Sequence, residues 1–234
     1  MCDRPVATPH LGILMLATRF PRPVGDIGNA ASFSFPVRYR TVAGATPQRV
    51  VRERASGLLD RFVAAANELV EEGAIGITTS CGFLAAFQQE LTAAVPVPVA
   101  TSSLLQAAWL ARLLPAGRCV GVVTIDAAAL EADHLAGVGA PLDLPIEGVD
   151  PGGEFATHIL GDHTTLDLVA AEREVVNAAI RLVARRPDVA AIVLECSNMP
   201  PYATSVHRAT RRPVYDVLTL LDWFWQGLLR PRAN

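Results

Sequence analysis

Two cysteines occupy equivalent places in the sequence and could work together as acid and base. Cys81 ends an apolar run that begins at Ile75, and Cys196 ends a similar run that begins at Ile192. Small or polar residues and then a helical pattern follow each run, which is typical of a buried strand that delivers a thiol to the start of a helix. A positioned thiol and thiolate can exchange protons with a reacting carbon. The sequence therefore indicates a pair of acid–base cysteines.

Other features recur at the same interval as the cysteines, which are 115 positions apart. Pro98-Val99 matches Pro213-Val214 at that spacing, and Gly12 and Gly121 lie in similar apolar runs further upstream. We interpret the chain as two copies of one α/β unit, each presenting one cysteine.

Two opposed thiols suit proton transfer at both faces of one carbon. One thiolate removes a proton next to a carboxylate or carbonyl, and the opposed thiol supplies a proton from the other side. A free thiol has a pKa of ~8.5, so the site must favour the thiolate. Proton transfer of this kind inverts the configuration at the carbon, as a racemase or epimerase does.

A few further side chains are candidates for the site. Arg19 and Arg22, in a segment rich in turn formers, could each clamp a substrate carboxylate or remain solvated surface arginines. Thr124 could contact a substrate or cap a helix. Glu195 precedes Cys196, and alternation along a strand would point its side chain away from the thiol, so we expect a buried, paired carboxylate.

The composition excludes several classes of function. All 20 basic residues are arginine, and without lysine there is neither a pyridoxal-phosphate Schiff base nor a phosphate-loop lysine. The net charge of −3 gives no reason to expect nucleic acid or an anionic membrane as a partner. His158 and His163 are not spaced like a zinc motif, so neither metal nor cofactor is expected.

The same data bear on location and redox state. No apolar run approaches the ~20 residues that span a bilayer, and no signal peptide precedes the first strand, so we expect a cytoplasmic protein. The four cysteines include no CxxC pair, and they should be reduced thiols. A homo-oligomer is compatible with the sequence.

Strands and helices are expected to alternate, which favours an α/β fold with mainly parallel sheets covered by helices. Strands are predicted at 11–16, 74–79, 97–100, 119–124, 190–195 and 213–215, and helices at 47–72, 83–94, 102–114, 165–186 and 217–229. Helices are also expected from Ala127 and Pro200, with a long loop over 18–46 and an irregular segment over 151–163. Residues 142–149 form either another strand or only a connection.

The repeat then predicts two pseudo-symmetric lobes. Residues 1–116 form an N-terminal lobe with Cys81, and residues 117–234 form a C-terminal lobe with Cys196. The prediction leaves open whether the last helix crosses back and packs on the first lobe. Ligands bind at the carboxyl ends of parallel strands, so the active site is expected in the cleft between the lobes.

This pattern resembles the aspartate/glutamate racemase superfamily, which includes aspartate, glutamate and hydantoin racemases, maleate isomerase and arylmalonate decarboxylase. The resemblance covers nearly the whole chain and rests on Thr79-Ser80-Cys81-Gly82, on the segment Glu195 to Pro200, and on Gly121-Val122-Val123-Thr124. It implies two flavodoxin-like lobes and a cofactor-free site between them.

Carried onto this sequence, the resemblance gives Cys81 and Cys196 the two acid–base positions. The positions where the family holds substrate carboxylates fall on Thr79, Ser80, Gly82, Thr124, Ser197 and Asn198. The segment Thr18 to Asn29 lacks the Gly-Gly-Met-Gly-Pro run of aspartate racemases, and Ser-Asn-Met-Pro follows Cys196 in place of Thr-Glu or Thr-His. These departures leave the identity of the substrate open.

The resemblance implies a cofactor-independent isomerase, a racemase or epimerase of a small carboxylate, amino acid or hydantoin. Two alternatives stay open: a maleate-isomerase-like or decarboxylase-like enzyme that uses a single cysteine, or a non-catalytic small-molecule-binding protein of the same fold.

Overall fold

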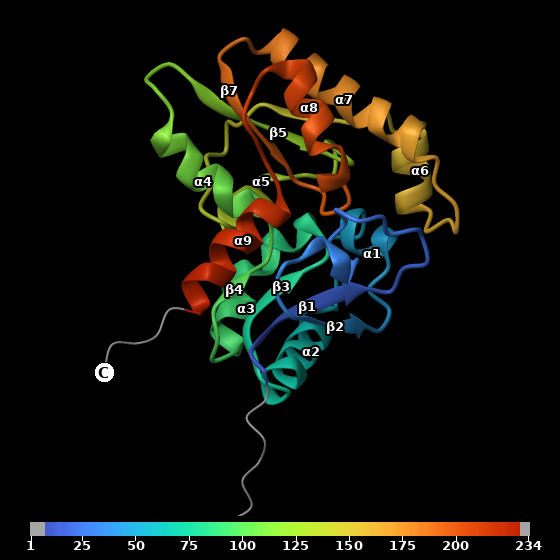
Figure 1. Cartoon of the computed structure of the whole chain (residues 1–234), viewed down its shortest axis with the longest axis vertical. Helices are drawn as coiled ribbons and strands as arrows, with labels where there is room; N and C mark the ends of the chain where they lie inside the picture. Colours follow the sequence, from blue (N-terminus) through green and yellow to red (C-terminus); the bar gives the residue numbers. More distant parts are fainter. Residues whose placement is uncertain (1–7, 230–234) are drawn as a thin grey trace, which may run out of the picture.

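The strands form two parallel sheets with the same strand order (Figure 1). The computed structural model describes residues 8–229, and Cys2 lies outside the described residues. Within that range the first sheet has the order β2 (Val37–Val42), β1 (His10–Leu16), β3 (Ala74–Thr79) and β4 (Val99–Ala100). The second has the order β6 (Ile146–Gly148), β5 (Cys119–Thr124), β7 (Val189–Leu194) and β8 (Val214–Tyr215). The predicted pair of pseudo-symmetric parallel sheets is confirmed.

The internal repeat extends to details of strand pairing. The register between β1 and β3 shifts between His10 and Leu11, and the register between β5 and β7 shifts between Cys119 and Val120. Both irregularities lie at the first residue of the central strand, so the two halves share their backbone irregularities as well as their strand order.

Helices cover both sheets. In the first half these are η1 (Ala30–Ser32), α1 (Pro47–Val51), α2 (Leu59–Glu71), η2 (Gly82–Phe87), α3 (Gln88–Ala94) and α4 (Leu104–Leu113), where η marks a 3₁₀ helix. In the second half they are α5 (Ala132–Gly137), α6 (Glu154–Leu160), α7 (Leu168–Arg185), η3 (Pro200–Tyr202), α8 (Ala203–Thr210) and α9 (Val217–Leu228). No helix within residues 8–229 combines the length and apolar character needed to cross a bilayer.

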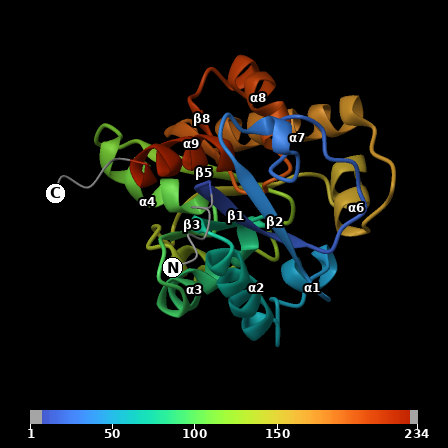
Figure 2. The same cartoon turned by 60° about the horizontal axis from the view of Figure 1, so that its bottom comes forward.

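Side chains of β1 alternate between two layers of core. Leu14 and Leu16 belong to the main core, which includes residues of α2, while Leu11, Ile13 and Met15 belong to a second cluster with residues of α9. This is the period of two that a strand covered on both faces requires. Figure 2 shows the first sheet with α2 and α3 on one side and α9 on the other.

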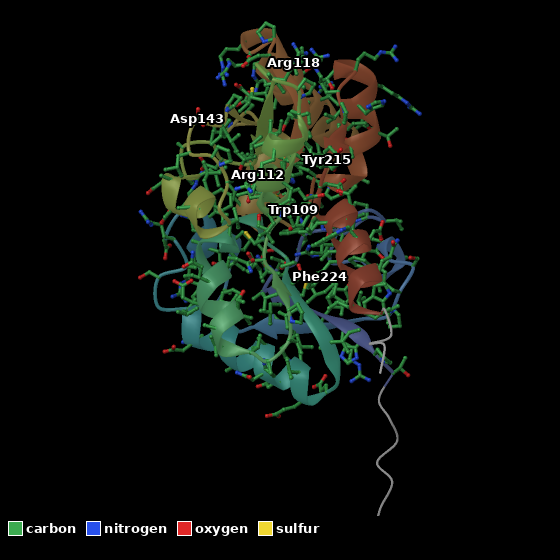
Figure 3. The ribbon with its side chains drawn as sticks, turned by 90° about the vertical axis from the view of Figure 1, so that its left-hand side faces the viewer. Trp109, Arg112, Arg118, Asp143, Tyr215 and Phe224 are labelled. Atoms are coloured by element: carbon green, nitrogen blue, oxygen red, sulfur yellow. The ribbon has the colours of Figure 1, made fainter. Side chains whose placement is uncertain are left out.

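The two halves exchange helices. Helix α9 follows the second sheet in sequence, yet its Leu221 and Trp225 pack on the first sheet. Helix α4 follows the first sheet, yet it packs against β5 and β7 of the second sheet. The rings of Trp109 on α4 and Trp223 on α9 lie 4.5 Å apart, where the two exchanged helices meet (Figure 3 labels Trp109 on α4 and Phe224 on α9).

The expectation of one long loop over 18–46 is wrong, because β2 lies within it. Val37 and Tyr39 pack on the second cluster while Arg38 and Arg40 pair with Glu72. This alternation is that of a half-exposed edge strand, and the glycines and prolines on either side of it masked the pattern.

Three helix predictions also need correction. The predicted helix over 47–72 is two helices, because Arg54, Ala55 and Gly57 have positive φ between α1 and α2. The segment 151–163 is not irregular, since it contains α6, whose Phe155 and Ile159 are buried. The helix expected from Ala127 begins only at Ala132.

Candidate active site

Cys81 and Cys196 line one cavity between the two halves. Each lies two residues beyond the carboxyl end of its strand, β3 or β7, and each is largely buried, with exposed fractions of 9% and 7%. The cavity holds about 350 Å³ of empty space, its open mouth included. The equivalence of the two cysteines in sequence is therefore an equivalence in space.

Both halves contribute to the cavity wall. The first supplies Leu16, Phe20, Arg22, Pro47, Val51, Ser80, Gly82 and Phe83, and the second supplies Ile125, Ile159, Leu160, Glu195, Ser197 and Asn198. The cavity thus brings together four of the predicted substrate-binding positions, namely Ser80, Gly82, Ser197 and Asn198.

The structure places three other predicted site residues outside this wall. The hydroxyl of Thr79 donates to the carbonyl of Thr101 at 2.7 Å, and that of Thr124 donates to the Glu195 carboxylate at 2.8 Å. Arg19 points outward, with 72% of its side chain exposed, and pairs with Asp162 at 3.1 Å.

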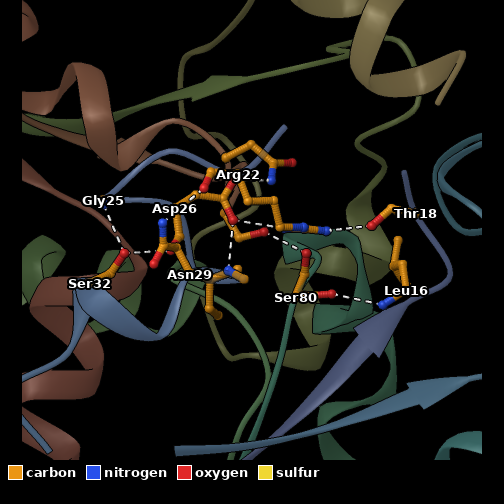
Figure 4. A network of polar contacts seen from close by, with 12 residues as sticks. Leu16, Thr18, Arg22, Gly25, Asp26, Asn29, Ser32 and Ser80 are labelled. Atoms are coloured by element: carbon orange, nitrogen blue, oxygen red, sulfur yellow. Dashed lines mark hydrogen bonds and ion pairs between the residues drawn. The ribbon is translucent and has the colours of Figure 1, made fainter. Parts of the chain in front are cut away.

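Arg22, the other candidate arginine, reaches the cavity instead. Its side chain is 13% exposed; Nη1 donates to Oδ1 of Asp26 at 2.8 Å and Nη2 to Oγ1 of Thr18 at 2.8 Å (Figure 4). A guanidinium has five N–H donors, so three remain after these two bonds. The sequence offered no signal that distinguishes Arg22 from Arg19, because both lie in the same turn-rich segment.

A chain of polar contacts runs from Arg22 to Cys196. The buried Asp26 accepts from Arg22 on Oδ1 and from Nδ2 of Asn198 on Oδ2, the latter at 2.7 Å. This contact fixes the Asn198 amide so that its Oδ1 faces Cys196, whose Sγ donates to it at 3.5 Å. The chain of contacts therefore connects the Arg22 guanidinium to the Cys196 thiol through Asp26 and Asn198.

Both thiols are harder to ionise than a free cysteine. Burial raises the pKa of the Cys81 thiol to about 12, and the neighbouring Glu195 charge adds to the rise, while the Phe83 N–H and the Arg22 charge oppose it. Burial also raises the pKa of Cys196 well above its usual value, with Glu195, Cys81 and Asp26 adding to the effect and the Asn198 N–H opposing it. A positive charge, that of Arg22, opposes the rise in pKa at Cys81.

Glu195 is buried and hydrogen-bonded, as the sequence predicted, but it also lines the cavity, which strand alternation did not predict. Strand β7 ends at Leu194, so strand alternation does not extend to Glu195, and the residue lines the cavity. Burial raises the pKa of its carboxyl to about 8. The carboxyl packs against Gly82, where a Cβ atom would come within 2.1 Å of Oε1, so residue 82 must be a glycine.

Two serines, Ser80 before Cys81 and Ser197 after Cys196, are hydrogen-bonded beside the cysteines. Oγ of Ser197 donates to the carbonyl of Ser80 at 2.5 Å, and Oγ of Ser80 accepts from the Leu16 amide at 2.9 Å. Both thiols are thereby held on a backbone that is cross-linked by hydrogen bonds. Among the described residues, no group of three or more His, Cys, Asp or Glu is arranged to hold a metal ion.

Curated relatives of the chain are enzymes. The chain is 30% identical to dimethylsulfoniopropionate lyase 7 of Emiliania huxleyi, and the match covers 94% of this chain and 67% of that protein. It is 29% identical to a dimethylsulfoniopropionate lyase of Durusdinium sp. clade D, over 94% of this chain and 75% of the relative. No protein-family model matches the chain.

Solved structures share the fold at low identity. Arylmalonate decarboxylase matches with a TM-score of 0.60 and 17% identity, over 97% of this chain and 95% of that chain. A glutamate racemase of Bacillus anthracis matches with a TM-score of 0.61 and 17% identity, over 97% of this chain and 86% of the other. The fold is thus that of the aspartate/glutamate racemase superfamily, as the sequence predicted.

Proposed function

Because this chain belongs to the dimethylsulfoniopropionate lyase family, we propose that it is a lyase that removes a sulfonium group from a propionate by β-elimination. The substrate we propose is dimethylsulfoniopropionate, which carries a carboxylate on C1 and a dimethylsulfonio cation on C3. This departs from the isomerase expected from the sequence but keeps its first step, the removal of a proton next to a carboxylate.

The reaction needs one base. In the proposed step the Cys81 thiolate takes the proton from C2, and the C–H electron pair forms the C2=C3 double bond. The C3–S bond breaks, its electron pair leaves with sulfur, and the products are acrylate and dimethyl sulfide. The Cys81 thiol then returns its proton to solvent.

Arg22 and Asn198 support the assignment of Cys81 as base. The Arg22 charge favours the Cys81 thiolate, and the same charge can stabilise the negative charge that develops near the substrate carboxylate. Asn198, oriented by Asp26, presents a carbonyl oxygen to Cys196, which disfavours an anionic sulfur there. Cys196 therefore acts in this proposal as a neutral neighbour of the substrate.

The observation that carries the proposal is the joint occurrence of the two buried thiols and Arg22 around one cavity, in a relative of these lyases. The test is to incubate the protein with dimethylsulfoniopropionate, measure dimethyl sulfide in the headspace, and follow the vinyl protons of acrylate by NMR. Equal amounts of the two products are expected. Unchanged substrate, with no C2 exchange in D2O, would reject both the lyase and its proton-abstraction step.

A second candidate, the racemase or epimerase, is favoured by the equivalent placement of the two cysteines. It predicts loss of the α-proton signal of an amino acid, hydantoin or 2-substituted acid in D2O without release of an alkene. The same NMR experiment therefore separates the two candidates.

A further inference from the structure

The Glu195 carboxyl is buried, and one of its two oxygens has no hydrogen-bond partner among the described residues. Oε2 accepts the hydrogen bond from Thr124, but no donor in the described part of the chain reaches Oε1, and the residue is only 1% exposed. Burying a polar atom without a partner costs about 1–3 kcal/mol, so native proteins rarely keep one without a use.

The position of this carboxyl relates it to the reacting groups. Glu195 precedes Cys196 directly, its Oε1 packs on Gly82, and Gly82 follows Cys81. Its charge acts on both thiols, since it contributes to the raised pKa of each. The carboxyl therefore lies beside the backbone segments that carry both thiols, and all three residues line the same cavity.

The charges around the cavity indicate which kind of ligand group would lie next to Oε1 of Glu195. Among the described residues of the wall, Arg22 is the one cation and Glu195 the one carboxyl. Asp26, behind the wall, already faces Arg22. A second anion on a ligand would disfavour the carboxylate form of Glu195, whereas a ligand with an anion at one end and a cation at the other favours the charged form of both groups.

The rest of the wall indicates what kind of cation fits. Most of it is apolar, including Leu16, Phe20, Phe83, Ile125, Ile159 and Leu160. An ammonium group has N–H donors and requires several hydrogen-bond acceptors around it. A methylated cation has no such donors and packs well against apolar and aromatic side chains.

We propose that Glu195 is the specificity-determining residue of this site and that its carboxylate holds a methylated cation at the far end of a zwitterionic propionate. This deepens the proposed function, on which it rests, by assigning the group that recognises the sulfonium. It also separates the site from those for dicarboxylate or malonate substrates, which would place a second negative charge beside Glu195.

The proposal predicts a proton release on binding. At neutral pH the raised pKa keeps Glu195 mostly protonated in the free protein. A bound cation favours the carboxylate, so Glu195 must give up its proton as the ligand enters. The other titratable groups near it are the Cys81 and Cys196 thiols and the Arg22–Asp26 pair. A bound cation favours thiolates too, so the Glu195→Gln variant is needed to assign the proton.

The test uses two ligands of similar shape and different charge. One is 3-(trimethylammonio)propionate, whose amine is a poor leaving group, and the other is 4,4-dimethylpentanoate, its neutral counterpart with a tert-butyl group. Titration calorimetry at pH 7, in two buffers of different ionisation enthalpy, gives the affinity and the number of protons released. We expect the cationic ligand to bind at least tenfold more tightly than the neutral one and to release a proton.

Variants then assign the effect to one side chain. Glu195→Gln keeps the size of the side chain and a partner for Thr124, and it should abolish both the preference and the proton release. Glu90→Gln, at an exposed position on α3, should change neither. Equal affinity of the wild-type protein for the two ligands would overturn the proposal, and this comparison needs no variant, so it holds even if Glu195→Gln is unstable. A preference that survives in Glu195→Gln would also overturn it.

Failure here and failure of the lyase remain distinguishable. Binding of the cationic ligand does not depend on turnover, so a protein that binds it selectively without forming acrylate would retain this inference and lose the proposed reaction. A protein that forms acrylate but binds both ligands with equal affinity would retain the proposed reaction and lose this inference.

Discussion

Oγ1 of Thr124, at the end of β5, donates a 2.8 Å hydrogen bond to the carboxyl of Glu195, just beyond the end of β7. Adjacent parallel strands end at the same edge of a sheet, so the two residues meet although 71 positions separate them. This contact holds the carboxyl at the cavity, where its ionisation affects both thiols and the stability of the fold.

The first prediction concerns the two thiols. In the lyase, Cys81→Ser should lower the rate of acrylate formation by at least ~100-fold, because a serine hydroxyl does not supply an anionic base. Cys196→Ser should retain a much larger share of activity, since its hydroxyl can still donate to Asn198. The initial rate of dimethyl sulfide release measures both. Equal, near-complete losses in the two variants would instead favour the two-base racemase-type site.

The second prediction compares Arg22 with Arg19, which lie in the same turn-rich segment. Arg22→Lys keeps a charge but loses the fork that binds Asp26 and Thr18, and we expect kcat/KM to fall by ~10–100-fold. Arg19→Lys is the matched control; its exposed pair with Asp162 contributes less than ~1 kcal/mol, so activity and stability should barely change. A larger effect at Arg19 than at Arg22 would show that the wrong arginine has been assigned to the site.

Gly82 provides a third prediction. An alanine there would place Cβ 2.1 Å from Oε1 and 2.3 Å from the backbone carbonyl oxygen of Glu195, so Gly82→Ala should impair both activity and folding stability. Removing the Glu195 side chain as well should not restore stability, because the carbonyl clash remains. Gly227→Ala, in α9 with open space around it, should be neutral or stabilise by up to ~1 kcal/mol. Thermal unfolding of the three variants measures these effects.

The raised pKa of Glu195 predicts how stability changes with pH. Between about 4.5, the ordinary value, and about 8 in the fold, the unfolded chain loses this proton before the native protein does. The contribution of Glu195 to stability is therefore full below pH 4.5 and falls as the pH rises to 8. Each pKa unit corresponds to about 1.4 kcal/mol, so the loss is on the order of a few kcal/mol.

The measurement is urea unfolding of the wild-type protein and Glu195→Gln from pH 5 to pH 8. The free energy of unfolding of the wild type should decline relative to that of the variant over this range, and Glu90→Gln should follow the wild type. Parallel curves for the wild type and Glu195→Gln would mean that the buried carboxyl is already ionised.

Local patterns were enough to predict both cysteine positions and most strands of the two sheets, the edge strand β2 excepted. Strands β3 and β5 have the predicted bounds, because each is a continuous buried run between clear turn signals. The internal spacing of the cysteines placed them correctly at one cavity, since a duplicated fold repeats its geometry. These features depend on residues that are close in the sequence or related by the repeat.

The features that the sequence did not reveal depend on neighbours from distant segments. Glu195 lines the cavity because β7 ends one residue earlier and because Gly82 of the other half leaves room for the carboxyl. Arg22 turns inward because the buried Asp26 and Thr18 hold it, whereas Arg19 finds Asp162 on the outside. No property of the residue types alone distinguishes these outcomes.

The exchange of α4 and α9 between the sheets makes the two halves one folding unit. Without α9, the face of β1 formed by Leu11, Ile13 and Met15 would be open to water, and without α4 the second sheet would lose a cover in the same way. Burial of apolar area is the main source of folding free energy, so neither half retains a complete core by itself. Calorimetry should show a single unfolding transition. Fragments 1–116 and 117–234 should each be largely unstructured alone but fold together when mixed, as a non-covalent complementation pair.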